Sequence, residues 1–209
     1  YKQPQAVRAT MSSRIAKDES TTIFNELNWV KDDLDNIKKI FIIACGTSYH
    51  AGIVGKYYIE QIAKIPVEVD IASEFRYRKP LVDESTLTIV ISQSGETSDT
   101  LAALKEAKRL GARTLAVTNV VGSSIAREAD QVIYTYAGPE IAVASTKAYT
   151  TQLAVMLMLA IYMGNIKNVL SSERSKELVH ALHILPEQLD ELLKDVTNIK
   201  EHAYRYKEA

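Results

Sequence analysis

The chain has 209 residues, of which 46% are hydrophobic and 24% charged, and its formal net charge is −1. This is the composition of an ordinary soluble domain, and its near-neutral charge excludes a broad basic surface for nucleic acid or an acidic membrane. The single cysteine excludes an internal disulfide and favours a cytoplasmic protein. The first ten residues have no apolar signal segment, and the longest apolar run, Leu153–Met163, is too short to span a bilayer.

Two helices are predicted before the first strand, over Ala6–Ala16 and Thr22–Leu34. The residues Glu19-Ser20-Thr21 between them are of types that cap helices. In the second helix the apolar side chains fall at helical spacing and predict one buried face. These side chains are Ile23, Phe24, Leu27 and Val30.

Strands and helices then alternate, which predicts a parallel sheet with right-handed crossovers. The expected strands are Lys39–Ala44, Val67–Ile71, Leu87–Ser92, Thr114–Thr118 and Gln131–Tyr134. The expected helices between them are Tyr49–Ala63, Leu101–Leu110 and Ser124–Ala129. The fold class predicted from this order is α/β, a five-stranded parallel sheet flanked by helices.

The sequence pattern changes after Gly138-Pro139. Lys147–Met163 is apolar nearly all round, so this helix is expected to be buried on most sides. From Ser171 onward the chain is helical and polar, and Pro186 is expected to break it once. We therefore divide the chain into an N-terminal helical segment (1–38), a central α/β domain (39–165) and C-terminal helices (166–209).

Thr88–Thr100, TIVISQSGETSDT, is the most informative stretch, because a buried strand ends there in a cluster of hydroxyl side chains before a helix. Free N–H groups and the positive dipole end at a helix start favour phosphate. Gly95 lets the backbone approach a ligand closely. The hydroxyl donors are Ser92, Ser94, Thr97, Ser98 and Thr100. No Lys or Arg lies in the turn, so neutral donors are expected to hold the phosphate.

A second polar turn, Cys45-Gly46-Thr47-Ser48, also follows a buried strand and opens a helix. Ligands of open parallel sheets lie outside the carboxyl ends of the strands, so the two turns are expected to line one crevice, although each can also be a simple helix cap. A third segment, Gly138–Tyr149, has small residues that let backbone donors reach a ligand. There Ser145 is alternatively the N-cap of the following helix.

Other reactive residue types give weaker signals. Cys45 lies near a helix start, where a thiol can act as a nucleophile, but no base is paired with it and a structural cysteine is favoured. Glu96 is either a base in the turn or a helix cap. The four histidines are scattered, and His180 and His183 alone make a poor metal site, so no metal is expected. Glu74, Arg76 and Arg78 form a charged turn, either a solvated face or a subunit contact.

Four segments together resemble the sugar isomerase (SIS) domain family, and within it the glutamine–fructose-6-phosphate aminotransferases. They are ACGTSYHAG, ASEFRYRKP, SQSGETSDTLAALKEAK and EIAVASTKAYTTQL. The N-terminal YKQPQAVRATMSSRI is similar to the linker that enters the isomerase half of those enzymes. The resemblance implies a flavodoxin-like three-layer sandwich and no cofactor. It also implies that the chain is the first of two SIS copies, without the N-terminal glutaminase and without the second copy.

The resemblance also implies the site residues. Those that would hold the sugar phosphate are Thr47, Ser48, Ser92, Gln93, Ser94 and Thr97, and those that would contact the sugar are Val143 and Ser145. The ligands would be hexose 6-phosphates such as fructose 6-phosphate and glucosamine 6-phosphate. The family's acid–base groups would lie in the second copy, so no catalytic residue is expected here, and a homodimer is expected.

Two other functions stay open at this point. One is a free-standing phosphosugar isomerase with a single SIS domain, which the missing base weakens. The other is a sugar-phosphate sensor that binds without turnover. A sensor of this kind needs a DNA-binding segment, and residues 1–38 carry no excess of basic charge.

Overall fold

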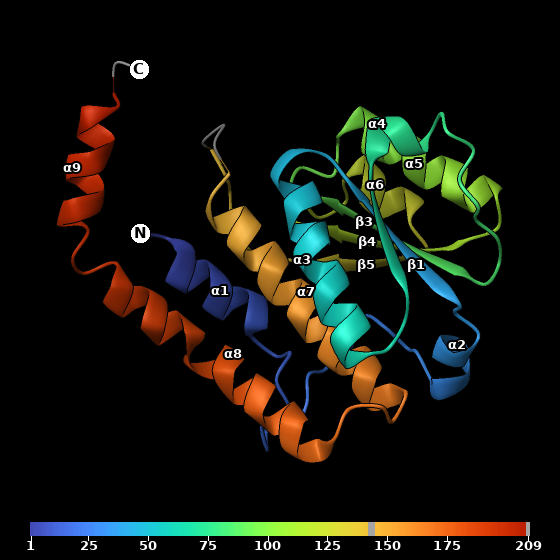
Figure 1. Ribbon diagram of the computed structural model, residues 1–209, viewed down its shortest axis with the longest axis horizontal. Coiled ribbons are helices and arrows are strands. Elements are labelled where there is room, and N and C mark those ends of the chain that lie inside the picture. Colours follow the sequence, from blue (N-terminus) through green and yellow to red (C-terminus); the bar gives the residue numbers. More distant parts are fainter. Residues whose placement is uncertain (142–144, 208–209) are drawn as a thin grey trace.

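The computed structural model describes residues 1–141 and 145–207, and its centre is a parallel sheet with the strand order β2-β1-β3-β4-β5 (Figure 1). The strands are β1 (Lys39–Ala44), β2 (Val67–Ile71), β3 (Thr86–Ser92), β4 (Arg113–Thr118) and β5 (Gln131–Tyr134). The predicted α/β fold class is confirmed, and this strand order is that of flavodoxin-like sheets.

Helices cover both faces of the sheet in three layers (Figure 1). On one face lie α3 (Gly46–Ile62) and α7 (Lys147–Ile166), with α1 (Gln3–Met11) and α8 (Ser172–Leu192) packed outside them. On the other face lie α4 (Ala72–Phe75), α5 (Ser98–Arg109) and α6 (Ser124–Glu128). The remaining helices are the short α2 (Lys31–Asp35) and α9 (Thr197–Arg205), which projects away from the domain.

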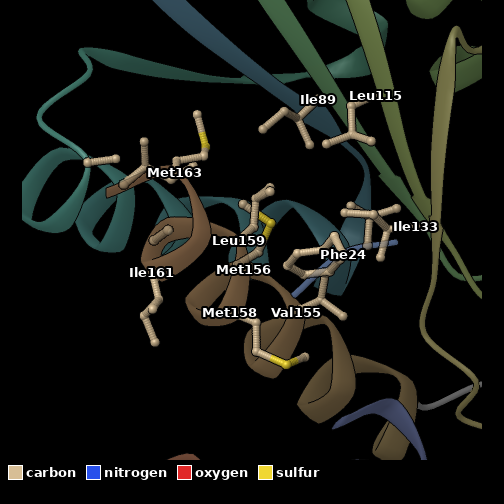
Figure 2. Close-up of a cluster of buried hydrophobic side chains, with 14 of the residues drawn as sticks. Phe24, Ile89, Leu115, Ile133, Val155, Met156, Met158, Leu159, Ile161 and Met163 are labelled. Carbon is tan, nitrogen blue, oxygen red and sulfur yellow. The ribbon is translucent and has the colours of Figure 1, made fainter. Parts of the chain in front are cut away.

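Alternating side chains of the strands supply two separate cores. Ile40 and Ile42 of β1 point to the α3 and α7 side, whereas Phe41 and Ile43 point to the α5 side. Figure 2 shows the larger core, in which strand residues such as Ile89 and Leu115 face Leu159 and its neighbours on α7. A strand buried on both faces has to be apolar throughout, which is why β1 and β3 read as continuous apolar runs.

α7 is the central helix of this larger core. By length and composition it could cross a membrane, but 61% of its apolar window is buried inside the fold, as expected for a core helix. Glycines bring it close to α3: a Cβ at Gly55 would lie 2.6 Å from Met156 Cε, and one at Gly164 would lie 2.9 Å from the Ile62 carbonyl oxygen. The two helices run side by side from the same end of the sheet.

The predicted helix over Thr22–Leu34 is wrong, because only α2 forms within it. Phe24 and Leu27 are buried, but Ile23 and Val30 are exposed, so the four apolar residues do not share a face. The segment instead docks on α7 as a loop. Thr22 Oγ1 donates to the Met158 carbonyl at 2.8 Å, and the Phe24 ring meets Tyr162 edge to face at 5.5 Å.

Two other helix predictions also need correction. α1 ends at Met11 instead of Ala16, because Ser13 adopts a left-handed φ of 63° and the chain then turns into a bridge between Ile15 and Thr22. Pro186 does not break α8, which continues to Leu192 with the proline inside it. Proline has no N–H, so the helix lacks one backbone hydrogen bond at this turn. The ring of Pro186 is buried close to residues of α1, and this packing stabilises the turn.

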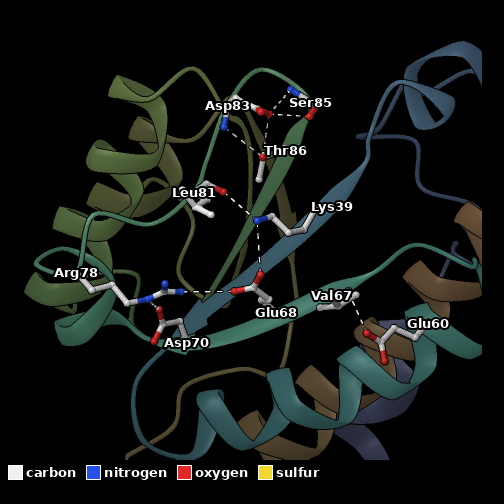
Figure 3. Close-up of polar contacts among 10 residues, drawn as sticks. All are labelled: Lys39, Glu60, Val67, Glu68, Asp70, Arg78, Leu81, Asp83, Ser85 and Thr86. Carbon is white, nitrogen blue, oxygen red and sulfur yellow. Dashed lines mark hydrogen bonds and ion pairs between the residues drawn. The ribbon is translucent and has the colours of Figure 1, made fainter.

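The charged turn after β2 is a short helix, α4, tied to the edge of the sheet. Phe75 is buried, with its ring 5.4 Å from that of Phe41. Arg78 pairs with Asp70 of β2, and Lys39 of β1 donates to the Leu81 carbonyl at 2.9 Å (Figure 3). Arg76 and Arg78 are therefore paired within the domain, with Asp99 and Asp70, and Tyr77 is largely exposed.

Candidate functional site

The two hydroxyl-rich turns meet at the switch point of the sheet. β1 and β3 are neighbours, and Ala44 at the end of β1 is in register with Ile91 near the end of β3. The helices that follow, α3 and α5, leave toward opposite faces of the sheet. In open parallel sheets a crevice forms at the carboxyl ends of two such strands, so this is the expected place for a ligand.

The turn after β1 is part of α3, which begins at Gly46 instead of the expected Tyr49. Thr47 is exposed and Ser48 is buried in the first turn of this helix. Ser48 Oγ accepts a hydrogen bond from Gln152 Nε2 of α7 at 3.0 Å. The first turn of α3 is therefore held against α7, while the N-cap side chain of Cys45 makes no capping bond.

The turn after β3 is built around the Ser92 hydroxyl. Ser92 Oγ accepts from the Gly95 N–H at 3.0 Å and lies 3.1 Å from Thr97 Oγ1. Ser94 Oγ accepts from the Glu96 N–H at 3.2 Å. Ser92 is buried, whereas Ser94, Thr97 and Gln93 are half-buried. Three hydroxyls are thus placed around the start of α5 at Ser98.

Gly95 has two structural reasons to be glycine. Its φ is +65°, a conformation that L side chains rarely adopt. A Cβ there would lie 2.0 Å from Ser123 Oγ and 2.8 Å from Thr118 Oγ1. The turn is also tied to α6, because the Ile125 N–H donates to the Gly95 carbonyl at 2.9 Å.

A contact between Thr100 and Cys45 joins the two turns. Thr100 Oγ1 donates to Cys45 Sγ at 3.9 Å across the gap between α5 and β1. Cys45 is half-buried, and in the described part of the chain its side chain has a polar contact with Thr100 and none with a basic group. This arrangement fits the structural cysteine, not the nucleophile.

Several helices begin at this edge of the sheet, and at the starts of α6 and α7 a carboxylate accepts hydrogen bonds from backbone N–H groups. Glu96 Oε1 accepts from the Ser124 N–H of α6 at 2.7 Å. Glu140 Oε2 accepts from the N–H groups of Thr146 and Ala148 at the start of α7, at 3.3 Å and 3.0 Å. Thr146, and not Ser145, is the N-cap of α7.

In the described chain no carboxylate accepts from the first-turn N–H groups of α3 or α5, and neither helix is capped by its own N-cap side chain. Asp99 lies in the first turn of α5 but pairs with Arg76. The hydroxyl oxygen of Thr97, the N-cap of α5, lies 3.1 Å from Ser92 Oγ. The first-turn N–H groups of both helices therefore remain available to an anion. Position and uncapped helix starts together make the pair α3 and α5 the candidate for an anion site.

Glu96 acts as a cap in this structure. Hydrogen bonding from Ser124 holds the pKa of the Glu96 carboxyl below its ordinary value, because it stabilises the charged form. A carboxylate with a lowered pKa is a weaker base, and this one is tied to a neighbouring helix. The alternative that Glu96 caps a helix is the one the geometry supports.

The predicted site residues divide into three groups. Ser92 and Thr97 contact each other directly, and Thr47, Ser48, Gln93 and Ser94 lie in the same two turns. Ser145 lies just before α7, and Val143 lies outside the described residues. Gln152, which contacts Ser48, was not predicted. Its only signal in the sequence is an amide inside an apolar helix.

A hollow of about 430 Å³ lies between α1 and α8. Two pairs of its titratable groups bind each other: Arg8 with Glu187 at 2.8 Å, and His183 with Glu19 at 3.2 Å. No cluster of three or more potential metal ligands occurs within residues 1–141 and 145–207. The two hydroxyl-rich turns at the strand ends therefore remain the better candidate site.

Comparison with known proteins places this geometry in a family context. Residues 33–162 match the SIS domain family. The chain is 57% identical over 203 residues to a glutamine–fructose-6-phosphate aminotransferase (isomerizing) of Caldanaerobacter subterraneus, a match that covers 97% of this chain and 33% of that protein. The chain thus spans about one third of the length of the curated relatives it matches.

Solved structures of related enzymes also superpose on this chain. The C-terminal domain of a glucosamine-fructose-6-phosphate aminotransferase from Francisella tularensis superposes with a TM-score of 0.91 at 37% identity, covering 100% of this chain and 58% of that one. A putative phosphosugar isomerase from Clostridium difficile superposes with a TM-score of 0.71 at 28% identity, covering 88% of this chain and 50% of that one.

Proposed function

The chain belongs to the SIS domain family, and from this membership we propose that it is the hexose-6-phosphate-binding first SIS copy of a glutamine–fructose-6-phosphate aminotransferase. The parent enzyme would convert fructose 6-phosphate and glutamine to glucosamine 6-phosphate and glutamate in the cytoplasm. It would do so together with a glutaminase and a second SIS copy. The resemblance of nearly the whole chain to such enzymes supports the parent activity.

One observation carries the binding role. Two helix starts without carboxylate caps, those of α3 and α5, lie side by side at the switch point and are surrounded by hydroxyls. Ser92, Ser94, Thr97 and Ser48 would donate to the phosphate together with the first-turn N–H groups. Ser145 and Val143 would contact the sugar, as the family resemblance implies.

The described residues of the crevice offer hydroxyls, an amide and backbone N–H groups, and Glu96 is engaged on α6. A proton shift between sugar carbons needs a base near those carbons. We therefore propose that this chain binds and orients the phosphate and that the base comes from the rest of the enzyme. Turnover of fructose 6-phosphate by this chain alone would favour a single-domain isomerase instead.

Isothermal titration with glucose 6-phosphate tests the binding role. Ser94→Ala and Thr97→Ala should each weaken binding by about 1–3 kcal/mol, because each removes a hydrogen bond to a charged group. Ser85→Ala, at the opposite end of β3, is the matched control and should leave the affinity unchanged. Unchanged affinity in both turn variants would remove the phosphate assignment.

A further inference from the structure

Gln152 is a polar residue in an otherwise apolar part of α7. Its side chain is only 2% exposed, at the contact between α7 and α3. Nε2 donates to Ser48 Oγ at 3.0 Å, while Oε1 is buried and has no hydrogen-bond partner in the described chain. Burying an amide with one end unpaired is unfavourable, so Gln152 stabilises the core less than an apolar residue would. Its presence needs another explanation.

The bond from Gln152 fixes which way the Ser48 hydroxyl points. A serine hydroxyl has one proton and two lone pairs. Because the amide nitrogen can only donate, it occupies a lone pair of Ser48 Oγ, and the proton of Ser48 has to go elsewhere. Ser48 lies in the first turn of α3, so the proton is available to a ligand bound at that helix start. A phosphate accepts hydrogen bonds, so a hydroxyl proton directed into the crevice is what it requires.

The turn after β3 uses the same principle with a backbone donor. The Gly95 N–H donates to Ser92 Oγ at 3.0 Å, and Ser92 Oγ lies 3.1 Å from Thr97 Oγ1. With one lone pair filled by Gly95, Ser92 can donate to Thr97, which would leave the Thr97 proton free for a ligand; the bond can also run in the opposite direction. In the first arrangement the Gly95 N–H acts on Ser92 as the Gln152 amide acts on Ser48.

We propose that Gln152 is a positioning residue for phosphate binding: its amide donates to Ser48 and so directs the Ser48 proton to the ligand. This inference rests on the proposed function, since it takes the crevice as the phosphate site. It assigns to α7 a role in the site that is separate from its role in the core. Gln152 itself, being buried behind Ser48, does not touch the ligand.

A double-mutant cycle on the 209-residue chain tests the proposal, with the dissociation constant for glucose 6-phosphate as the readout. Ser48→Ala should raise this constant about 10- to 100-fold. Gln152→Met keeps the volume and apolar packing but removes the donor, and should raise it about 3- to 10-fold. In the Ser48→Ala background Gln152→Met should change it less than about twofold, because residues acting through one another are not additive.

A second substitution and a control sharpen the test. Gln152→Glu puts an acceptor where the donor was, so it should weaken binding more than Gln152→Met does. Thr151→Val is the control, since Thr151 is also buried but donates to Ala148 within its own helix, and its affinity should equal that of the parent chain. Circular dichroism of each variant checks that it is folded.

The possible outcomes distinguish failure of the phosphate site from failure of the positioning role of Gln152. If Ser48→Ala binds normally, the assignment of Ser48 to the phosphate site fails. If Ser48→Ala weakens binding and Gln152→Met does not, the positioning role alone is overturned. Additive effects of the two substitutions would also overturn it, because they would show that Gln152 acts on the fold and not through Ser48.

Discussion

Two glycines in the candidate site have positive φ angles, but only one of them is also confined by neighbours. Gly46 has a φ of +57° and no atom within 4 Å of a would-be Cβ, whereas a Cβ at Gly95 would collide with Ser123. Gly46→Ala should therefore cost only the backbone strain, about 1–2 kcal/mol of unfolding free energy. Gly95→Ala should cost more, because it adds the collision.

Urea denaturation of both variants measures this difference. The two substitutions add the same methyl group at the same kind of backbone position, so each is the control for the other. Equal losses would show that the contact of the turn with Ser123 is absent in solution. Ser123→Ala should restore part of the stability of Gly95→Ala but none of that of Gly46→Ala.

The Glu96 carboxylate should make stability depend on pH. Its pKa is lowered in the folded chain by hydrogen bonding from Ser124, so the folded state binds its proton less readily than the unfolded state. The charge therefore contributes stability above the ordinary pKa of a glutamate, and this contribution is lost as the pH falls through the folded value. Glu96→Gln should melt at a lower temperature than the parent chain at pH 7.

Thermal melts of the two chains from pH 7 to pH 3 test this prediction. The difference between their melting temperatures should shrink with falling pH, because the parent carboxylate becomes protonated and then resembles the neutral amide. Glu106, whose pKa is lowered by Arg109 on α5, provides a comparison away from the site. A difference that stays constant with pH would contradict the assignment of the charged carboxylate as the cap of α6.

At the residue scale, the sequence indicated the hydroxyls of both turns because residue type and position after a buried strand are enough to do so. It could not indicate Gln152, since the contact with Ser48 spans 104 positions and depends on how α7 packs against α3. The same holds for Ser123 under Gly95. Contacts between residues far apart in the sequence depend on tertiary packing, so a local sequence pattern cannot predict them.

At the scale of elements, strands were predicted better than the N-terminal helices. A strand buried on both faces has to be apolar along its whole length, so β1 and β3 are recognisable locally. Thr22–Leu34 has apolar residues at helical spacing, yet Trp29 Nε1 donates to Gln131 at 2.6 Å and Tyr162 donates to the Leu27 carbonyl at 3.1 Å. These long-range contacts fix a loop and override the helical pattern.

Because Thr22–Leu34 packs on α7 as a loop, its apolar residues should contribute unequally to stability, which an amphipathic helix would not predict. Phe24 is 2% exposed and packs on Tyr162, whereas its neighbour Ile23 is 36% exposed. Phe24→Ala should lower the free energy of unfolding by about 3–5 kcal/mol, the usual cost of removing a buried aromatic ring. Ile23→Ala should change it by less than about 1 kcal/mol. Denaturant titration gives both values. Similar losses of unfolding free energy for the two variants would contradict the loop and favour the amphipathic helix.

At the scale of the whole molecule, the apolar surface of α7 is largely covered. α1, α3 and α8 pack against it, so the core helix by itself does not require a second chain. The arginines of the α4 segment are paired with Asp99 and Asp70 in the same domain, which removes part of the expectation of a subunit contact there. Exposed apolar side chains remain at several places, such as Leu81 and Val121, and those that gather on one helix projecting from the domain are on α9.

α9 has no buried residue, and its apolar side chains recur at helical spacing at Val196, Ile199, Ala203 and Tyr206. Tyr204 and Leu192 are also largely exposed nearby. An amphipathic helix that projects from a domain with its apolar stripe in water favours association. In the complete enzyme that we propose, further parts of the protein could cover this stripe, whereas in the isolated chain a second copy is available.

We therefore predict that the 209-residue chain forms a dimer through α9, since a twofold pair is the commonest closed arrangement. Sedimentation equilibrium over a range of concentrations should give a dimer at about 100 μM, well above the micromolar constants of weak but specific complexes. Ile199→Asp places a charge in the stripe and should shift the chain to a monomer. Glu201→Lys, on the opposite side of the same helix, is the control and should still dimerise. A parent chain that is monomeric at that concentration would refute the prediction, and a dimer that survives Ile199→Asp would move the interface away from α9.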